Sequence, residues 1–194
     1  MNWTSQIKTA RLILRPHQES DYEDWYAGFS GRLPQQHPYD PGQEDISHCD
    51  RAWFSKLCQR QQQTALKDQS YSFGVFCRAT NQHLGNIDLS TLRRDENQWA
   101  ILGYEIHNQY WRRGFGKEAV RAALMSGFTD LNFHRIEAQI NLDNHASIAL
   151  AKSAGMQQEC IRRRFIYENQ QWVDHWIYAA IPPDLGITEK SPTR

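Results

Sequence analysis

Two glycines one residue apart, with basic side chains around them, are the residues of this sequence best suited to bind a charged ligand. Gly114 and Gly116 allow the backbone to turn sharply and to expose consecutive N–H groups where a helix is expected to begin. The same turn carries three cations, Arg112, Arg113 and Lys117. Because N–H groups at a helix N-terminus bind phosphate, the turn predicts a diphosphate site. It does not predict a Walker-type nucleotide loop, since its lysine is followed by glutamate rather than serine or threonine.

The overall composition argues against several classes of protein. A chain of 194 residues fits one domain. Its 22 Lys and Arg residues balance its 22 Asp and Glu residues, which argues against a general binder of nucleic acid or membrane surfaces. The four cysteines show neither CxxC nor zinc spacing, so we expect reduced thiols and no metal. We also find no apolar run of ~20 residues and no signal-peptide pattern, and therefore expect a cytoplasmic protein.

The segments that must position the glycine turn alternate between strand and helix patterns. Strand patterns fall at 9–16, 71–77, 84–92, 98–107, 134–141, 157–165 and 172–181, and helix patterns at 20–31, 45–66, 116–131 and 144–155. Short connections between the early strands favour an antiparallel meander, whereas the helix after the glycines should make its two flanking strands parallel. We therefore expect an α/β (α+β) fold with a mixed, mostly antiparallel sheet of six to seven strands and about four helices. The predicted domain is 1–183, followed by a polar tail at 184–194.

Five short segments together resemble a known family. They lie at 9–15, 102–106, 111–119, 144–147 and 154–156. In this order they resemble the GNAT superfamily of N-acetyltransferases, and within it the RimJ/RimL-type ribosomal-protein N-acetyltransferases. The superfamily signature Gln/Arg-x-x-Gly-x-Gly/Ala falls on Trp111 to Gly116, with Trp111 in place of the usual first residue. The resemblance covers nearly the whole chain and implies a sheet that splays near its middle.

The resemblance also implies a cofactor, acetyl-coenzyme A, and the residues that would bind it. Backbone N–H groups in the glycine turn would hold the diphosphate. The strand end before the turn would pair with the pantetheine arm through its backbone, and the helix that begins near 144 would lie along the arm and the thiol. The predicted cofactor-binding residues are Ile106, His107, Trp111, Arg112, Arg113, Gly114, Phe115, Gly116, Lys117, Asn144 and Ser147.

Acetyl transfer from a thioester to an amine needs a base, an oxyanion donor and an acid for the thiolate. We predict Glu105 and Ser147 as catalytic residues, the first as base and the second as the hydroxyl that helps the thiolate leave. A backbone N–H near Ile106 is the candidate oxyanion donor. Glu105 can equally be a carboxylate paired with a lysine or arginine, and Ser147 an ordinary first-turn residue. Weaker candidates for the base are Asp88, Glu137, Tyr167, Glu168 and Asp174, and the histidines His107 and His145 flank the site.

The acceptor is expected to be a primary amine, and by resemblance the leading acceptor is the N-terminal α-amine of a ribosomal protein. Two alternatives remain open. One is acetylation of a small-molecule amine such as a polyamine, amino acid or antibiotic, and the other is a non-catalytic module that binds acyl-coenzyme A. Transfer should be direct, because no cysteine or serine stands in a nucleophile–base arrangement. Both a monomer and a homodimer are compatible with the sequence.

Overall fold

The computed structural model describes residues 3–189 and 191. In this part of the chain, eight strands form one sheet in the order β1-β2-β3-β4-β5-β6-β8-β7. The strands are β1 (Ile7–Lys8), β2 (Leu12–Arg15), β3 (Ser70–Cys77), β4 (His83–Arg93), β5 (Trp99–Ile106), β6 (Arg135–Asn141), β7 (Gln157–Glu168) and β8 (Gln171–Ala180). The helices are α1 (Tyr22–Ser30), α2 (Arg51–Leu66), α3 (Phe115–Thr129) and α4 (His145–Ala154), with single 3-10 turns at Glu19–Asp21, Asn108–Tyr110 and Pro182–Leu185.

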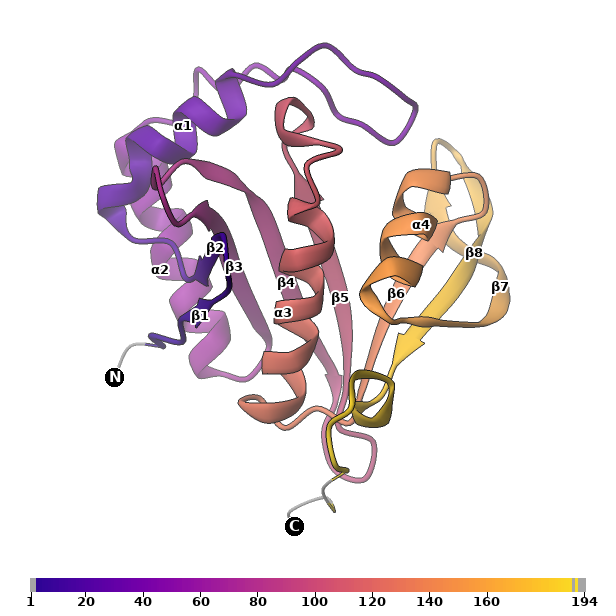
Figure 1. The fold of residues 1–194 in the computed structure, drawn as a ribbon. Coiled ribbons are helices and arrows are strands. Elements are labelled where there is room, and N and C mark those ends of the chain that lie inside the picture. The colour runs from indigo at the N-terminus through magenta and orange to yellow at the C-terminus, as the bar shows by residue number, and fades with distance from the viewer. Residues whose placement is uncertain (1–2, 190, 192–194) are drawn as a thin grey trace.

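The sheet is antiparallel except at its centre, where β5 and β6 run parallel on either side of the crossover helix α3. These two strands pair over only three residues, Trp99–Ile101 with Arg135–Glu137. Beyond that point β5 continues to Ile106 while β6 diverges with β7 and β8, so the sheet opens into a V (Figure 1). The mixed sheet, its parallel pair and its splay are confirmed. The eighth strand was missed because β1 has two residues, too few for a periodic pattern.

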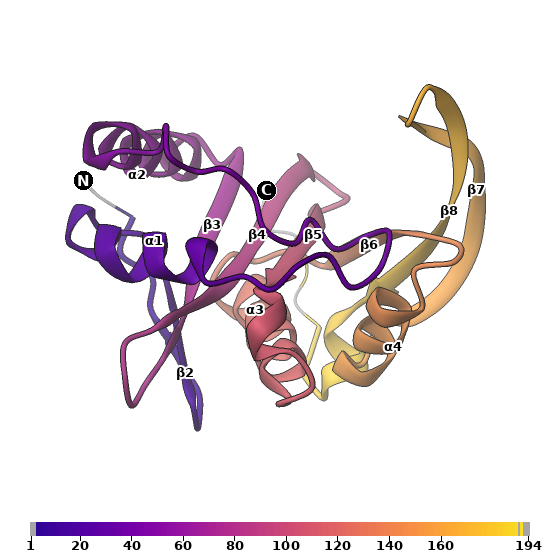
Figure 2. The same cartoon turned by 90° about the horizontal axis from the view of Figure 1, so that it is seen from above.

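Helices cover the two faces of the sheet differently. Helices α3 and α4 lie on one face, and α1 and α2 lie on the opposite face of β3 and β4 (Figure 2). The main hydrophobic core fills the space between the sheet and α3, where Leu12, Phe73 and Leu124 are fully buried. A second, smaller cluster around Trp25 and Phe54 joins α1 to α2. Helix α1 also contacts β4, and α2 contacts β3, so this helical layer covers the second face of the sheet.

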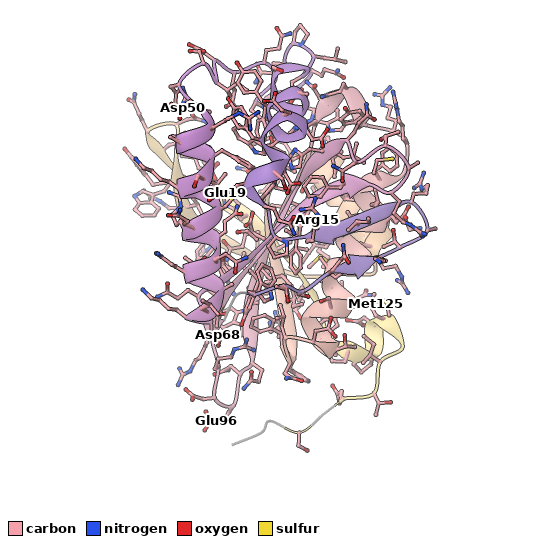
Figure 3. The ribbon with its side chains drawn as sticks, turned by 90° about the vertical axis from the view of Figure 1, so that its left-hand side faces the viewer. Arg15, Glu19, Asp50, Asp68, Glu96 and Met125 are labelled. Carbon is pink, nitrogen blue, oxygen red and sulfur yellow. The ribbon has the colours of Figure 1, made fainter. Side chains whose placement is uncertain are left out.

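Helix α2 is shorter than its sequence pattern suggests. It begins at Arg51 because the Asp50 side chain accepts a hydrogen bond from the N–H of Trp53, which is an N-cap geometry. Figure 3 shows Asp50 at one end of this helix and Asp68 beyond the other. Residues 31–50 are consequently one long loop, where the sequence predicted a helix from 45 onward. This loop extends from α1 towards the open end of the V (Figure 1).

The structured domain extends beyond the predicted boundary at residue 183. Leu185 is buried against the main core, and Ile187 also packs there. The tail predicted from residue 184 therefore begins with residues that contribute to the fold, because the turn that contains Leu185 packs against α3. The described residues include no helix long and apolar enough to cross a membrane.

Candidate active site

The glycine turn forms an exposed row of backbone donors at the start of α3. Arg112 and Gly114 have φ angles of +58° and +78°, and Gly114 is the N-cap residue of the helix. The first helical hydrogen bond comes from the N–H of Glu118 to the carbonyl of Gly114. Between residues 3 and 189, no protein acceptor takes a hydrogen bond from the N–H groups of residues 112–117. An anion can therefore bind there without displacing a protein contact.

Ion pairs hold this turn against the first long strand. Arg11 Nη1 donates to the carbonyl of Arg113 at 2.8 Å, and Arg11 Nε lies 2.7 Å from Glu118 Oε2. The Glu118 carboxylate also accepts hydrogen bonds from Thr9 and from the N–H of Arg11. Burial raises the pKa of Glu118, but these hydrogen bonds outweigh it and the pKa is lowered. The glutamate that excludes a Walker loop thus fixes the glycine turn to the segment between β1 and β2.

The register of β4 and β5 determines which backbone groups face the V. The N–H of His107 donates to the carbonyl of Leu84 at 2.8 Å, and Glu105 lies opposite Asn86 in the same register. Because hydrogen-bonded and free pairs alternate along an antiparallel ladder, Tyr104 and Ile106 direct their backbone groups away from β4. Those groups point to the side where β6 has diverged. The N–H of Ile106 is therefore available to a ligand in the V.

Trp111 explains the departure from the family signature. Its indole Nε1–H donates to the carbonyl of Ile106 at 2.6 Å, and its ring stacks on His37 with centroids 5.1 Å apart. The indole thus occupies the acceptor of Ile106 and leaves the donor free. It also holds the long loop 31–50 over the V.

Two further contacts fix that loop. The side chain of Asn108 donates to the carbonyl of Leu33 at 2.7 Å and to Asp40 Oδ2 at 3.0 Å. At the far side, the Tyr39 hydroxyl donates to Asp143, just before α4. This hydrogen bond raises the pKa of Tyr39 to about 12, with burial adding to it. The loop therefore bridges the two arms of the V above the glycine turn (Figure 2).

A cavity of about 770 Å³ lies in the V beneath this loop. Nine of the predicted cofactor-binding residues line it: Ile106, Trp111, Arg112, Gly114, Phe115, Gly116, Lys117, Asn144 and Ser147. Gly116 lets α4 approach, since a Cβ there would lie 3.2 Å from the Leu150 side chain. The free N–H groups, the cations and a cavity lined by residues of both α3 and α4 fit a diphosphate with a long thiol-bearing arm.

Two predicted cofactor residues lie elsewhere. His107 is 1% exposed, its N–H is bonded to Leu84 and its carbonyl accepts from Tyr110, so it has no free backbone group for the pantetheine. The backbone groups of His107 therefore do not face the V, because ladder alternation turns every second residue of this segment towards β4. The carbonyl of Arg113 accepts a hydrogen bond from Arg11, and its guanidinium lies over the Tyr110 ring.

Two hydroxyl groups meet at the cavity wall near the start of α4. Asn144 caps this helix by accepting from the N–H of Ser147 at 3.1 Å. The Ser147 Oγ lies 2.6 Å from the hydroxyl of Tyr104 on β5. Burial raises the pKa of Tyr104 to about 12, so this phenol stays protonated at neutral pH. Tyr104 is not among the site residues predicted from the sequence, where its position on a strand bordering the predicted cofactor was the only available signal.

Glu105 faces the opposite side of the sheet from Tyr104, since neighbouring strand residues alternate. Its Oε1 lies 2.7 Å from Nη2 of Arg32, a guanidinium that is 2% exposed at the start of the long loop. The alternative considered for Glu105, a carboxylate paired with an arginine, is therefore what the geometry shows. The Glu105 side chain is nevertheless 38% exposed and lines the cavity. It remains accessible to a ligand.

Three buried histidines hold Arg32 in place. Arg32 Nε donates to His107 Nδ1 at 2.9 Å, His107 Nε2 lies 3.0 Å from His83 Nδ1, and His83 Nε2 lies 3.2 Å from His17 Nε2. His17 Nδ1 ends the row at Gln61 Oε1, 3.0 Å away. Because arginine can only donate, the row has one consistent set of tautomers with every imidazole neutral. Burial lowers the pKa of all three, that of His107 to about 3.

A second cavity, of about 600 Å³, lies under α1 and α2 on the Glu105 side of the sheet. Tyr104 and Glu105 line both cavities, so the two meet at this point of β5. The walls of the second cavity combine aromatic side chains with carboxylates. The aromatic residues are Trp25, Phe29, Trp53 and Tyr104, the histidines are His17 and His48, and the acidic residues are Glu44, Asp45, Asp88 and Glu105.

The weaker sequence candidates are distributed unevenly around these cavities. Glu137 is buried between Arg135 and Arg162, with oxygens 2.7 and 3.1 Å from their guanidiniums. In the closing hairpin, Tyr167 is exposed, Glu168 accepts from Asn141, and Asp174 accepts from the N–H of Arg164.

His145 is an exposed residue at the first position of α4. Of the weaker candidates, Asp88 is the one that lines a cavity next to Glu105.

Comparison with known proteins agrees with this geometry. The model of the acetyltransferase (GNAT) domain matches residues 11–157. A probable N-acetyltransferase of Bacillus subtilis, YjcK, is 33% identical over 61% of this chain, and the match spans 65% of that relative's length. The [ribosomal protein uS5]-alanine N-acetyltransferase of Escherichia coli is 25% identical over 92% of both chains.

A solved structure shows the same fold. Mycobacterium smegmatis RimJ in complex with CoA-disulfide superposes with a TM-score of 0.78 at 19% identity, covering 98% of this chain and 92% of that one. The splayed sheet, the glycine turn at the start of α3 and the match over most of the chain lead to one conclusion: the protein belongs to the GNAT acetyltransferase family.

Proposed function

We propose that this protein transfers the acetyl group of acetyl-coenzyme A directly to a primary amine. The observation that carries the proposal is the row of free backbone donors that begins at Ile106 and continues from residue 112 to 117 along one cavity. When bound there, the thioester supplies an activated acetyl group. The protein then has to orient that group, remove a proton from the amine and return one to the thiolate.

The backbone of β5 provides the electrostatic part of this role. The N–H of Ile106 points into the V, where negative charge develops on the acetyl oxygen. A fixed donor in a site shielded by the long loop stabilises that charge without reorganisation of water. Trp111 occupies the carbonyl of the same residue, since its indole N–H donates to that oxygen at 2.6 Å.

The two side-chain roles are assigned to opposite faces of β5. Tyr104 and Ser147 form the acid on the cofactor side, in which the protonated phenol supports the serine hydroxyl next to the thiol. Glu105 acts as the base on the amine side, with its orientation fixed by Arg32. Because Arg32 neutralises the carboxylate in part, a bridging water is the expected route for the amine proton.

The α-amine of a ribosomal protein is the acceptor suggested by the 25%-identical E. coli relative, which acts on ribosomal protein uS5. A small-molecule amine is the second candidate, and the acidic and aromatic cavity beside Glu105 favours it. A peptide N-terminus would have to enter the same cavity from the open side of α1 and α2.

A thiol-release assay tests the proposal. Purified protein and acetyl-coenzyme A are incubated with N-terminal peptides, including that of uS5, and with small amines, and free thiol is measured. Amine-dependent release supports acetyl transfer, and the responding amine identifies the acceptor class. If coenzyme A binds in calorimetry while no amine in a broad panel releases thiol, the protein is instead a non-catalytic acyl-coenzyme A binding module.

A further inference from the structure

The carboxylates in the middle of the central strands differ in whether a positively charged side chain is paired with them. Glu137 is buried and has two arginine partners. Asp88 is half-buried in the middle of β4, and its hydrogen-bond partner is the Ser72 hydroxyl. Among residues 3–189 and 191, no Lys, Arg or His side chain forms an ion pair with Asp88. A half-buried carboxylate is stabilised by a nearby cation, and the described part of the chain pairs none with Asp88.

Asp88 lines a cavity whose acidic and aromatic walls suit a cation. None of the residues that line the 600 Å³ cavity is Lys or Arg. Arg32 forms ion pairs with two of the carboxylates that line the cavity, Glu105 at 2.7 Å and Glu44 at 3.6 Å. It forms none with Asp45 or Asp88. The rings of Trp25 and Trp53 line the same space, and aromatic faces attract cations, especially where water is excluded.

A glycine keeps the cavity floor open at this point. Gly103 lies directly opposite Asp88 in the β4–β5 ladder and is exposed to the cavity. A Cβ built there would meet nothing closer than 4.0 Å, and the φ of Gly103 is not in the left-handed region, so neither packing nor backbone conformation requires a glycine. Glycine in the middle of a strand costs stability and often marks a place where a ligand approaches the backbone.

We propose that this cavity binds a second cationic group of the acceptor, held by Asp88 while the reacting amine lies at Glu105. The inference rests on the proposed function and deepens it, since it assigns the acceptor to dicationic amines. Asp88 and Glu105 occupy diagonal positions on one face of the ladder, because Asp88 is opposite Gly103 and Glu105 is opposite Asn86.

The ladder geometry also sets the spacing of the two cations. Diagonal neighbours have Cα atoms roughly 7–8 Å apart. A chain of roughly three to five carbon atoms between the two nitrogens bridges that distance, since each single bond is about 1.5 Å long. A short alkane diamine meets this requirement, and so does a peptide that begins with arginine.

Binding of amines, measured by calorimetry with coenzyme A present, tests the inference without depending on turnover. 1,4-Diaminobutane is expected to bind at least about ten-fold more tightly than butylamine, as a charge-assisted hydrogen bond at a second site would give. Diamines of two and of eight carbons should lose most of this advantage. Equal affinity for butylamine and 1,4-diaminobutane would overturn the inference, whatever the enzyme acetylates.

Two variants test whether Asp88 is responsible. Asp88→Asn retains an acceptor for the Ser72 hydroxyl, and it should abolish the preference for the diamine. Gly103→Val places two methyl groups on the cavity floor and should weaken diamine binding, while coenzyme A binding reports that the fold is intact. Asp174→Asn, a strand carboxylate outside both cavities, is the matched control. A diamine preference that survives Asp88→Asn contradicts the assignment.

Measurements of turnover identify which kind of molecule carries the second cationic group. Thiol release is compared between 1,4-diaminobutane and butylamine, and between peptides that begin with arginine and with alanine. Preference for the diamine indicates a free polyamine-like acceptor, and preference confined to the arginine peptide indicates a protein N-terminus. If the diamine binds through Asp88 but nothing is acetylated, the subsite stands and the proposed acetyl transfer fails.

Discussion

The two faces of strands β4 and β5 differ sharply, although their residues alternate along the same segments. On the α3 face, Ile87, Leu89 and Leu102 are buried in the main core. On the α1–α2 face, Asn86, Asp88 and Glu105 line or border a cavity. Because side chains point alternately to the two faces of a strand, every second residue can anchor the strand in an apolar core while its neighbours carry polar chemistry.

In the proposed function, strand β5 serves two substrates, one on each face. Tyr104, at the end of the apolar face, meets Ser147 and the cofactor cavity. Glu105, one residue later, faces Arg32 and the second cavity. Between these faces, the backbone of Ile106 opens into the V. The apolar face, which is packed in the main core, keeps the strand rigid. The polar face and the cavities can be tested separately from it.

The largest effect is expected at the glycine turn. Gly114→Val forces a β-branched residue into φ +78° and places a Cβ 3.2 Å from Arg11, so the row of N–H donors should be disrupted and coenzyme A binding lost. Gly186→Val is the matched control, since Gly186 has φ +74° with no neighbour within 4 Å of its Cβ position. Undiminished coenzyme A affinity in Gly114→Val, measured by calorimetry, would refute the phosphate-site assignment.

The next largest effect is expected at the hydroxyl pair of Tyr104 and Ser147. Tyr104→Phe keeps the ring in the core and removes the phenol that contacts Ser147, so kcat should fall about 100-fold, as for loss of a general acid–base group, with unchanged coenzyme A affinity. Tyr178→Phe, which removes another buried phenol bonded to Gln158, is the control and should retain activity. A Tyr104→Phe enzyme with a normal kcat would show that the phenol is only structural.

The polar face should make folding sensitive to acid. Burial lowers the pKa of His107 to about 3, from an unfolded value near 6.5. Between these values the unfolded chain binds a proton that the folded chain does not, so the free energy of unfolding falls as pH drops below 6.5. Each such histidine contributes up to ~1.4 kcal/mol per pH unit.

Urea unfolding at pH 7, 6 and 5 measures this loss, and His107→Gln should reduce its slope. His134→Gln is the control, because His134 is half-exposed and lies outside the buried row of histidines. A slope between pH 6.5 and 5 that is as steep in His107→Gln as in the natural protein would contradict neutral burial of this histidine.

The smallest effect is expected at Trp111. Trp111→Phe retains a ring to stack on His37 but removes the donor to the Ile106 carbonyl. One lost hydrogen bond is worth about 1 kcal/mol, which corresponds to a drop of roughly five-fold in kcat/KM. A larger drop, with loss of coenzyme A affinity, would indicate that Trp111 mainly holds the long loop closed.

The sequence by itself determined the order of the elements, and its resemblance to the GNAT superfamily predicted the class of cofactor. Strand and helix periods, the two glycines and the Asn144 cap are local signals, and each was found at its predicted place within a few residues. Errors arose where local signals are weak. The two-residue β1 has no period, and the apolar residues before Asp50 suggested helix until the cap fixed its start.

Only the tertiary structure decided which residues share a site. Tyr104 meets Ser147, and Glu105 meets Arg32, across long stretches of chain. The row of His17, His83 and His107 joins three separate segments, and the sheet register alone turned the N–H of Ile106 into the V and that of His107 away from it. The physical reason is that periodicity reports which face a residue takes, whereas register and packing between distant segments decide what lies opposite it.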